Sequence, residues 1–513
     1  MRSSVRGGLA GVAAAGAALG VAELVGVGTG AGSGPLVAVG GVVVDHVPAA
    51  VKDFGIRVFG VHDKTALLSG TAILLGLYAY GLGVLALRRW ALAVAGIGLF
   101  GLVGAAAAVT REGAGAGGAL PSLLGAVAGL FVLRHLRRRA EQEDPEPDDP
   151  EPGVAGPGGT PYRRRLFLRD LGIVAGVAAG AAAGGRLLSS RRAVDVARQA
   201  VALPAAAGSV PVVPSGAQVS GAVPYVTPNR DFYRIDTALV TPQVDPATWR
   251  LRIHGMVRNP IEITWDELLR RPMVERYVTL ACVSNEVGGD LIGNALWLGT
   301  PIKDLLDEAD PLPGADQVVQ RSADGWTCGA PTSVLRDGRD ALLAVGMNGE
   351  PLPVAHGFPV RMIVPGLYGY VSACKWITEI ELTRFADFDA YWVPRGWSAQ
   401  APIKTQSRID TPRDGTSRAA GSIMVAGVAW AQHRGIAKVE VQVDDGPWTP
   451  ASLAPAVSAD TWRQWSHPWE ATSGEHILRV RATDTDGVTQ MANVAPPAPD
   501  GATGWHQVKV SVE

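Results

Sequence analysis

The first quarter of the chain consists of apolar runs long enough to cross a lipid bilayer, which takes about 20 residues. These runs lie at residues 7–28, 65–87, 91–110 and 118–133. A fifth run, at residues 171–185, is shorter and weaker. The pattern predicts an N-terminal membrane domain, residues 1–140, with about four transmembrane helices, and one further apolar helix after it.

A sixth apolar run, at residues 35–44, is too short to span a bilayer, and Asp45 follows it directly. We expect this run to lie at the membrane interface or to re-enter the bilayer. Cytoplasmic flanks of membrane helices collect Lys and Arg. The basic clusters are Arg2 with Arg6, Arg88 with Arg89, and Arg134 with Arg137, Arg138 and Arg139. All three fall on the cytoplasmic side only if the short run does not cross, which favours four spans.

Residues 141–165 are acidic at first and then rich in Pro and Gly, which predicts a disordered cytoplasmic linker. The segment ends in Arg163, Arg164 and Arg165, which Leu-Phe-Leu and a Gly/Ala-rich apolar run follow. This arrangement resembles a twin-arginine export signal. The alternative is an ordinary basic flank. We predict that residues 166–220 form an anchor helix and a linker, and that the remainder lies on the extracytoplasmic side of the cell membrane.

From residue 222 the pattern changes to short β-branched or aromatic runs, broken by Pro, Gly, Asn and Asp. Strands are expected at 249–254, 261–264 and 277–282, and short helices at 265–269 and 301–308. Residues 221–402 are therefore predicted to form an α+β domain in which strands are the majority.

Past residue 402, alternating apolar and polar positions at 437–443 and 476–482 predict strands, with a turn at Asp444-Asp445-Gly446. Residues 403–513 are predicted to form an all-β, immunoglobulin-like sandwich. The whole chain is thus multi-domain, with membrane helices, an α+β domain and a β-sandwich in that order.

Composition excludes several classes of function. Charged residues are 18% of the chain, against about 25% in ordinary soluble domains. The net charge of −2 gives no electrostatic reason to expect nucleic acid as a partner. Three cysteines are too few for a disulfide framework or a zinc site. A b-type haem needs axial ligands, commonly His, and no His lies in the four long runs, so no haem is predicted.

Two segments of the α+β domain concentrate unusual chemistry. In the first, a predicted strand ends at Cys282, and a polar turn with Asn285 follows. In the second, His356-Gly-Phe-Pro-Val-Arg361 is followed by Lys375-Trp376. The Gly and Pro between His356 and Arg361 set the backbone so that both side chains can converge on one anion, and an Arg fork is a good phosphate ligand.

From about residue 222 to the C-terminus, these residues resemble the sulfite-oxidase family of molybdenum enzymes. The Cys-x-x-Asn piece at Cys282, the Met347-Asn-Gly-x-Pro-Leu-Pro segment, the His-Gly-Phe-Pro-Val-Arg core and the Lys-Trp ending occur in the family's order. The resemblance implies a molybdenum–molybdopterin cofactor, with Cys282 as the catalytic thiolate ligand of the metal. A buried small hydrophobe is the alternative role for this cysteine.

The resemblance also implies the residues that hold the cofactor. His356 and Arg361 would bind the pterin phosphate, and Lys375, with the backbone around Ser372, would bind the pterin ring. For Asp324 a plain turn residue is an equal alternative. The complete set of cofactor-binding residues is Asn229, Tyr233, Cys282, Asp324, His356, Arg361, Ser372 and Lys375. Cys328 and Cys374 match nothing catalytic and are expected in the core.

The chain departs from the family at the positions where the family's sulfite oxidases bind a small oxyanion. Val287 stands where they have an arginine, and the closest match to a second arginine is Asp236, with Arg234 two residues away. A segment with a pocket Lys and Trp is missing after Asn285, and no equivalent of a later Asp-Tyr pair is clear. These losses predict a less basic pocket, suited to a neutral or larger substrate.

We therefore expect an exported, membrane-tethered molybdopterin oxidoreductase that acts on a small substrate other than sulfite, or poorly on sulfite. Electrons would pass to a separate partner, and the C-terminal domain, which resembles the family's dimerisation domain in position, would allow a homodimer; a monomeric β-module is the alternative. Two other functions stay open. One is a reductase of the methionine-sulfoxide type, and the other is a non-catalytic, membrane-tethered β-rich binding protein.

Overall fold

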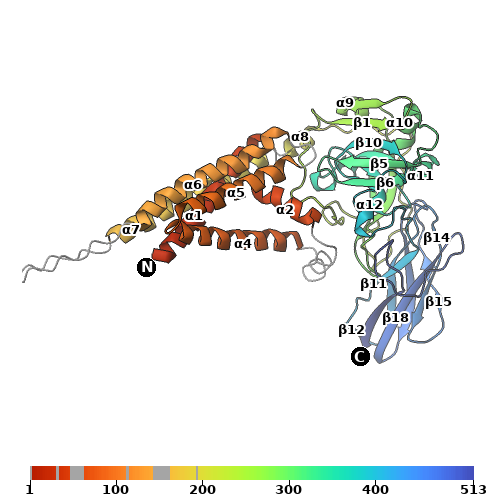
Figure 1. Ribbon diagram of the computed structural model, residues 1–513. Helices are drawn as coiled ribbons and strands as arrows, with labels where there is room; N and C mark the ends of the chain where they lie inside the picture. Colours follow the sequence, from red (N-terminus) through yellow and green to blue (C-terminus); the bar gives the residue numbers. More distant parts are fainter. Residues whose placement is uncertain (1–2, 30–33, 47–62, 111–114, 142–161, 192–193) are drawn as a thin grey trace, which may run out of the picture. The chain divides into compact units, whose positions relative to one another are not determined.

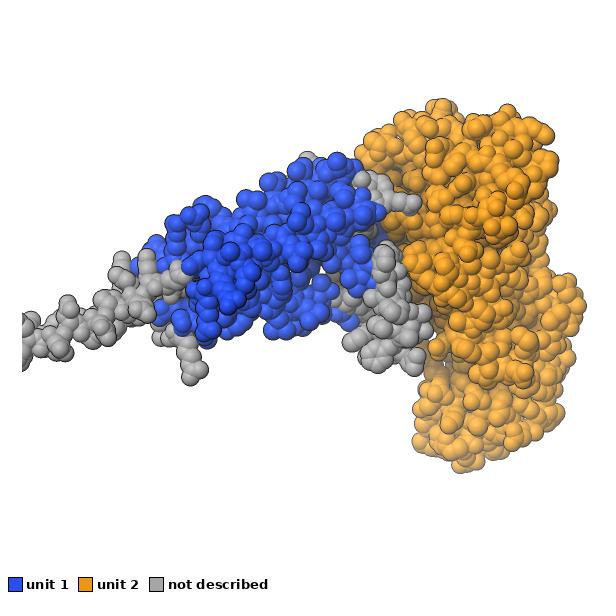
Figure 2. All heavy atoms as spheres, viewed as in Figure 1, with its two compact units in different colours: residues 1–193, 238–243 blue, residues 194–237, 244–513 orange. Residues whose placement is uncertain are grey.

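The computed structural model describes residues 3–29, 34–46, 63–110, 115–141, 162–191 and 194–513 (Figure 1). The chain divides into two compact units, coloured separately in Figure 2. The first unit comprises residues 1–193 and 238–243, and the second comprises residues 194–237 and 244–513. Most of the predicted linker at 141–165 lies outside the described residues.

The described part of the first unit is helical. Its helices are α1 (Ser3–Thr29), α2 (Pro35–His46), α4 (Asp63–Ala86), α5 (Trp90–Val109), η2 (Ala116–Ala119), α6 (Leu120–Glu141) and α7 (Tyr162–Arg191). Among the described residues, five segments are long and apolar enough to cross a membrane: Ser3–Thr29, Ser69–Ala86, Trp90–Val109, Ala116–Arg139 and Leu166–Gly185. They correspond to the four predicted runs and the fifth, weaker one. At about 1.5 Å per residue, the 12 residues of α2 are too short for an apolar layer of about 30 Å.

Helix α1 packs against α4, α6 and α7, and small residues allow its close approach to α4. A Cβ atom at Gly11 would lie 2.0 Å from the carbonyl oxygen of Ala79, and one at Gly83 would lie 2.1 Å from that of Gly7. No other residue type fits at these two crossing points. Such small-residue contacts are typical of helix packing in membranes.

Helix α6 continues for two turns beyond the apolar run that predicted it. His135, expected in a flank, consequently lies inside the candidate span Ala116–Arg139. Its Nε2 is 3.3 Å from a carboxylate oxygen of Asp170 on α7, and Arg139 Nε lies 3.3 Å from the same oxygen. A buried carboxylate in an apolar helix is costly unless it is paired, and these contacts pair it.

In the second unit, a five-stranded sheet has the order β2-β1-β10-β5-β6. Its strands are β1 (Arg250–Gly255), β2 (Ile261–Thr264), β5 (Gln317–Ser322), β6 (Thr327–Pro331) and β10 (Ile377–Thr383). Within this sheet the β1–β10 pair is parallel and the other pairs are antiparallel. Helix α9 (Trp265–Leu269) follows β2 without a linker, because the Thr264 side chain and Glu267 form a reciprocal capping box.

A second sheet carries the strand that leads to Cys282. Its order is β3-β4-β7-β8, and β9 also pairs with β7. Its strands are β3 (Val274–Ala281), β4 (Ile292–Pro301), β7 (Leu342–Met347), β8 (Glu350–Pro351) and β9 (Arg361–Ile363). Strand β3 is wholly buried from Val278 to Ala281, which fixes the position of the following cysteine. Helices α10 (Ile302–Ala309), α11 (Thr332–Arg336) and α12 (Gly369–Ser372) connect and cover the strands.

The C-terminal part of the second unit is all-β. One of its sheets has the order β11-β13-β17-β16 and the other has the order β12-β19-β18-β14-β15. The strands are β11 (Gln406–Thr411), β12 (Thr416–Arg418), β13 (Gly421–Trp430), β14 (Ile436–Val443), β15 (Thr449–Pro450), β16 (Ser452–Leu453), β17 (Arg463–Ala471), β18 (Gly474–Asp484) and β19 (His506–Val512). Their inner faces share one apolar core around Trp465, Val441 and Val480.

Thr279, three residues before Cys282, ties this all-β part to β3. Its N–H donates to the carbonyl of Asp460 at 3.0 Å, and its carbonyl accepts from the Gln432 side chain at 2.9 Å. Its hydroxyl accepts from the N–H of Trp462 at 2.8 Å. Thr279 and Gln432 are fully buried. Because unpaired buried polar groups are costly, these bonds fix the C-terminal part directly behind the cysteine strand.

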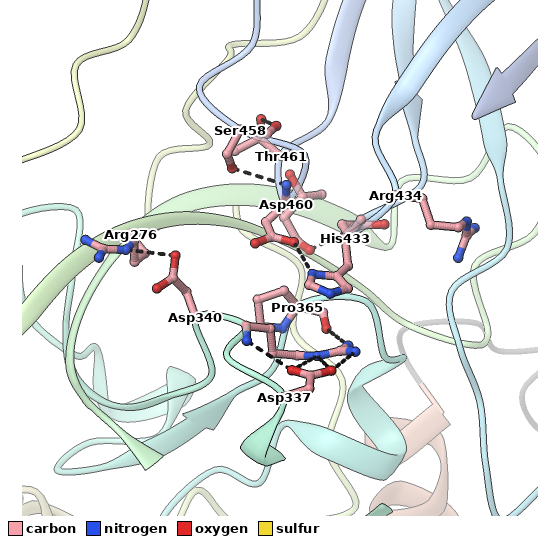
Figure 3. Close-up of polar contacts among 12 residues, drawn as sticks. Arg276, Asp337, Asp340, Pro365, His433, Arg434, Ser458, Asp460 and Thr461 are labelled. Atoms are coloured by element: carbon pink, nitrogen blue, oxygen red, sulfur yellow. Dashed lines mark hydrogen bonds and ion pairs between the residues drawn. The ribbon is translucent and has the colours of Figure 1, made fainter. Parts of the chain in front are cut away.

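Figure 3 shows the polar surroundings of the Asp460 carboxylate. One carboxylate oxygen lies 3.5 Å from Nδ1 of His433, and the backbone N–H of Asp460 donates to the Ser458 hydroxyl at 3.1 Å. Nearby, Arg276 at the start of β3 pairs with Asp340 at 2.8 Å. Burial raises the pKa of Asp460, and His433 opposes that rise. Each of these ion pairs lies within one part of the second unit, whereas the hydrogen bonds of Thr279 join the two parts.

Candidate cofactor site

A hollow opens in the second unit beside Cys282 and encloses about 800 Å³ of empty space out to its mouth. Most of the residues predicted to bind a cofactor line it. They are Tyr233, Cys282, Asp324, His356, Arg361 and Lys375. Residues that are up to 142 positions apart (233 and 375) in the chain thus meet at one surface.

The loop after β3 holds Cys282 at this surface. The Cys282 N–H donates to the carbonyl of Leu291 at 2.9 Å, and the Cys282 carbonyl accepts from the N–H of Asn285 at 3.1 Å. The Asn285 side chain in turn accepts from the N–H of Leu291 at 2.8 Å. The Cys-x-x-Asn spacing therefore closes the loop onto the start of β4.

The Cys282 thiol is buried, with 8% of the residue exposed. Burial raises its pKa, while hydrogen bonds from Ser284 and the charge of Lys375 act in the opposite direction. A thiolate at this position therefore needs a nearby positive charge, and coordination to a metal supplies one. The site fits a metal ligand better than a free nucleophile.

The chain between His356 and Arg361 brings both residues to the hollow. Gly357 adopts a left-handed backbone with φ of 113°, in which a Cβ would lie 3.0 Å from that of Arg361. The Arg361 guanidinium donates to the carbonyl of His356 at 3.1 Å. Gly357 therefore allows the backbone to turn back, so that both residues line the hollow.

Arg361 is a buried cation with no acidic partner among the residues that the structure describes. Its guanidinium lies over the Trp297 ring, 5.2 Å from the centroid. Burial lowers its pKa to about 10, which leaves it charged at neutral pH. A buried charge without a counter-ion is strongly destabilising, so this end of the hollow fits an anionic group such as a phosphate.

His356 is held by Asn229, which does not itself line the hollow. Its Nε2 lies 3.2 Å from the backbone carbonyl of Asn229 and must carry the proton, because a carbonyl only accepts. Asn229 is anchored through its side-chain oxygen, which accepts from Asn348 at 2.8 Å. Burial and the charges of Arg361 and Lys375 lower the pKa of His356 to about 4, so the ring is neutral at pH 7 until an anion approaches.

Lys375 forms an ion pair that sequence reasoning missed. Its Nζ lies 2.8 Å from a carboxylate oxygen of Asp236, and Nε of Arg234 lies 3.1 Å from the same oxygen. Burial lowers the pKa of Lys375 to about 8, although Asp236 opposes that shift. Asp236 lines the hollow, with 5% of its side chain exposed. In the sequence it drew notice only as an acidic residue at the position of a family arginine.

Asp324 and Ser372 occupy different positions relative to the hollow. Asp324 lines it, and one carboxylate oxygen also accepts from the N–H of Trp326 at 3.1 Å, so the residue closes a turn as well. Ser372 is fully buried behind the surface, and its hydroxyl donates to the carbonyl of Tyr368 at 3.0 Å. The neighbouring Ala373 reaches the lining instead.

Aromatic side chains form one wall of the hollow, and no local pattern in the sequence marks them. Trp326, Tyr370 and Trp392 line the hollow beside Cys282. Trp397 packs behind this wall, with its ring centroid 5.7 Å from that of Tyr370 and 6.2 Å from that of Trp392. Tyr370 and Trp392 therefore contact one common ring, and together with Trp326 they give the hollow an apolar lining.

The arginines that could have compensated for the family's missing cations do not line the hollow. Arg395 stacks on the Tyr391 ring at 3.7 Å, and Arg234 pairs with Asp236. Val287 does not line the hollow either. Cys328 and Cys374 are fully buried in the apolar core, as predicted.

Comparisons with known proteins agree with this geometry. A family model described as "Oxidoreductase molybdopterin binding domain" matches residues 238–392, a range that contains Cys282, His356, Arg361 and Lys375. Mitochondrial sulfite oxidase of Rattus norvegicus is 28% identical over 340 residues, or 56% of this chain and 62% of that protein. The uncharacterized oxidoreductase YuiH of Bacillus subtilis (strain 168) is 30% identical over 182 residues, or 35% of this chain and 87% of that protein.

Among solved structures, the sulfane dehydrogenase SoxCD from Paracoccus pantotrophus aligns with 56% of this chain and 83% of its own, at 22% identity and a TM-score of 0.48. This chain spans less than two thirds of the length of the mitochondrial sulfite oxidases that it matches.

Proposed function

This chain belongs to the sulfite-oxidase family of molybdopterin-dependent oxidoreductases, and on that basis we propose that it is a membrane-tethered, exported enzyme that acts on a small substrate other than sulfite. The observation that carries the proposal is the hollow in which Cys282, His356, Arg361 and Lys375 meet. A soft sulfur ligand and an uncompensated cation that line the same hollow match a metal carried on a phosphorylated organic ligand.

Each residue has a separate task in this proposal. When bound, the molybdenum centre supplies two-electron oxygen-atom exchange chemistry. Cys282 binds the metal, and Arg361 with His356 binds the phosphate. Lys375 donates hydrogen bonds to the pterin, with Asp324 and Tyr233 beside it, while Asn229 and Ser372 fix the loops that carry these groups. The buried surroundings exclude water and strengthen each of these electrostatic contacts.

Replacement of Arg361 by alanine tests the cofactor assignment. The purified wild-type protein should contain molybdenum and pterin in equal amounts. Arg361→Ala should retain about ten- to a hundredfold less cofactor. A charge-assisted hydrogen bond contributes about 1.5–3 kcal/mol, and about 1.4 kcal/mol corresponds to a factor of ten. Metal analysis measures the molybdenum content, and fluorescence after denaturation measures the pterin content.

Arg321→Ala is the matched control, since Arg321 pairs with Glu379 and Glu381 away from the hollow. It should keep the cofactor. Unchanged pterin content in Arg361→Ala would show that Arg361 is merely structural, and a wild-type protein without molybdenum would reject the proposed function.

Export by the twin-arginine route is part of the proposal, because that pathway moves folded proteins and the cofactor is inserted before transport. Arg164→Lys with Arg165→Lys keeps both charges but removes the guanidinium pair. We expect the N-terminal helices to stay in the membrane and the second unit to remain inside, so that protease added from outside no longer cleaves it. The pair Arg88→Lys with Arg89→Lys is the control and should leave export unchanged. Normal export of the first variant would favour an ordinary basic flank.

Partners follow from the family and from the all-β C-terminal part. Because no haem is expected in this chain, electrons would pass to a separate protein or membrane carrier. The two-sheet C-terminal part around Trp465 would be an immunoglobulin-like module through which two copies could associate.

A reductase of the methionine-sulfoxide type is a second candidate function. It is favoured by the aromatic wall of Trp326, Tyr370 and Trp392, which suits an uncharged sulfoxide better than an oxyanion. A non-catalytic binding protein is disfavoured, because it would keep the buried charge of Arg361 without a use for it.

A further inference from the structure

The loop that follows Cys282 is also held from outside the hollow, by the all-β C-terminal part of the second unit. Arg408, on β11, donates from Nη1 to the carbonyl of Gly289 at 2.7 Å. Gly289 lies two residues before Leu291, whose carbonyl accepts from the Cys282 N–H at 2.9 Å. One arginine of the all-β part therefore binds the backbone that leads away from the cysteine and back to it.

Arg408 is itself fixed by a buried carboxylate. Its Nε donates to one oxygen of Asp410 at 2.7 Å, and the two side chains are 8% and 7% exposed. The other oxygen of Asp410 accepts from the N–H of Val223 at 3.1 Å. A buried ion pair needs such further hydrogen bonds to satisfy its polar atoms. The guanidinium is thus held in place while Nη1 donates to Gly289.

Two further residues of the all-β part pack against the same loop. Gly288 has a left-handed backbone with φ of 79°, and a Cβ there would overlap the His506 ring. The ring is held because its Nδ1 accepts from the N–H of Ile409 at 3.0 Å. A Cβ on Gly504 would lie 3.5 Å from a methyl group of Val287. The loop therefore has close contacts with the all-β part at three consecutive positions.

These contacts act on the cysteine from behind. Within the stretch 194–513 that the structure describes, the all-β part supplies none of the residues that line the hollow. The hydrogen bonds of Thr279 fix the strand before Cys282, and Arg408 fixes the chain after it. Groups behind a metal ligand commonly set its orientation and are needed for full metal affinity.

We propose that Arg408 is a positioning residue for the metal ligand, so that the all-β part shapes the metal site by holding the Cys282 loop through Gly289. This inference rests on the proposed function, since it takes Cys282 as the ligand. Without Arg408 the Gly289 carbonyl loses a charge-assisted hydrogen bond, and the chain between Cys282 and Leu291 gains freedom. The cysteine sulfur then occupies a wider range of positions.

Alkylation of the Cys282 thiol measures the position of the loop without any contribution from the metal. Full-length protein would be purified from cells that cannot make the pterin cofactor and treated with iodoacetamide. Peptide mass spectrometry would follow the modification of Cys282 separately from the other two cysteines. Arg408→Gln should be alkylated at Cys282 at least about tenfold faster than the wild type, because loss of a charge-assisted hydrogen bond favours opening of the loop by about that factor.

Arg434→Gln is the matched control. Arg434 belongs to the same all-β part, where its Nε pairs with Asp484 at 3.0 Å and its Nη2 donates to the carbonyl of Ile403 at 2.8 Å. These partners lie outside the Cys282 loop, so alkylation should stay at the wild-type rate. Equal acceleration in both variants would show that the all-β part had merely loosened. That result, or no acceleration in folded Arg408→Gln, would overturn the proposal.

Gly288→Ala provides a second variant in case Arg408→Gln does not fold. The added methyl group meets the His506 ring and is strained at a positive φ, so it displaces the loop while the Arg408–Asp410 pair stays in place. Alkylation of Cys282 should be faster here too. An unchanged rate would show that contacts with the all-β part do not set the position of the cysteine.

The molybdenum-loaded protein gives a second readout. Compared per molybdenum atom, the paramagnetic resonance signal of the reduced metal should shift or broaden in Arg408→Gln and stay unchanged in Arg434→Gln. A signal in Arg408→Gln identical to that of the wild type would contradict the inference. A wild-type protein without molybdenum would instead reject the proposed function, while the alkylation rates would still show whether Arg408 holds the loop.

Discussion

Replacement of Cys282 by serine should abolish turnover while the protein stays folded. The side chain is buried at the end of β3, and its loop is held by backbone bonds to Leu291 and Asn285 that the substitution does not touch. A serine hydroxyl is nearly isosteric but is a poor ligand for a metal that binds thiolate. We expect turnover below about 0.1% of the wild-type rate, equivalent to about 4 kcal/mol of lost transition-state stabilisation. Molybdenum content should fall or the metal's paramagnetic resonance signal should change.

Cys328→Ser is the matched control for this variant. This variant makes the same exchange of sulfur for oxygen at a second cysteine. Cys328 is fully buried and lies on β6 in the core, and it does not line the hollow. Burying a hydroxyl there should lower the melting temperature, at a cost of about 1–3 kcal/mol, and leave turnover near the wild-type value. Full activity and normal metal content in Cys282→Ser would refute the assignment of this cysteine.

Elements that depend on local chemistry could be predicted from the sequence. Strand β2 and helix α9 occur at the predicted residues, because the Thr264–Glu267 capping box is encoded in four consecutive positions. Strand β3 begins three residues before the predicted strand at 277–282 and ends at Ala281, one residue before the predicted end at Cys282. Similarly, Gly357 lies between His356 and Arg361 in the sequence itself, so the convergence of these two side chains could be inferred from the order of residues alone.

The remainder of the site depends on contacts between distant segments. The Asp236–Lys375 ion pair joins positions that are 139 residues apart, and nothing near Asp236 in the sequence marks it as a partner of a lysine. The aromatic wall likewise combines Trp326, Tyr370 and Trp392 from three separate segments of the chain. Alignment with the family drew attention to position 236 only because a positive charge was missing there. The structure shows that the acidic side chain at this position lines the hollow and pairs with Lys375 and Arg234.

Sulfite should be a poor substrate or no substrate at all, and this second large effect follows from the same charges. Val287, at the position of a family arginine, does not line the hollow, and Arg234 and Arg395 are engaged with Asp236 and Tyr391. A dianion would lose at least two charge-assisted contacts of about 1.5–3 kcal/mol each, which corresponds to roughly two to four orders of magnitude in binding.

Steady-state kinetics with an artificial electron acceptor would measure this discrimination. A kcat/KM for sulfite of about 10⁴ M⁻¹s⁻¹ or more is ordinary for an enzyme and its own substrate. Such a value would show that the hollow binds sulfite through other groups than the family's missing arginines.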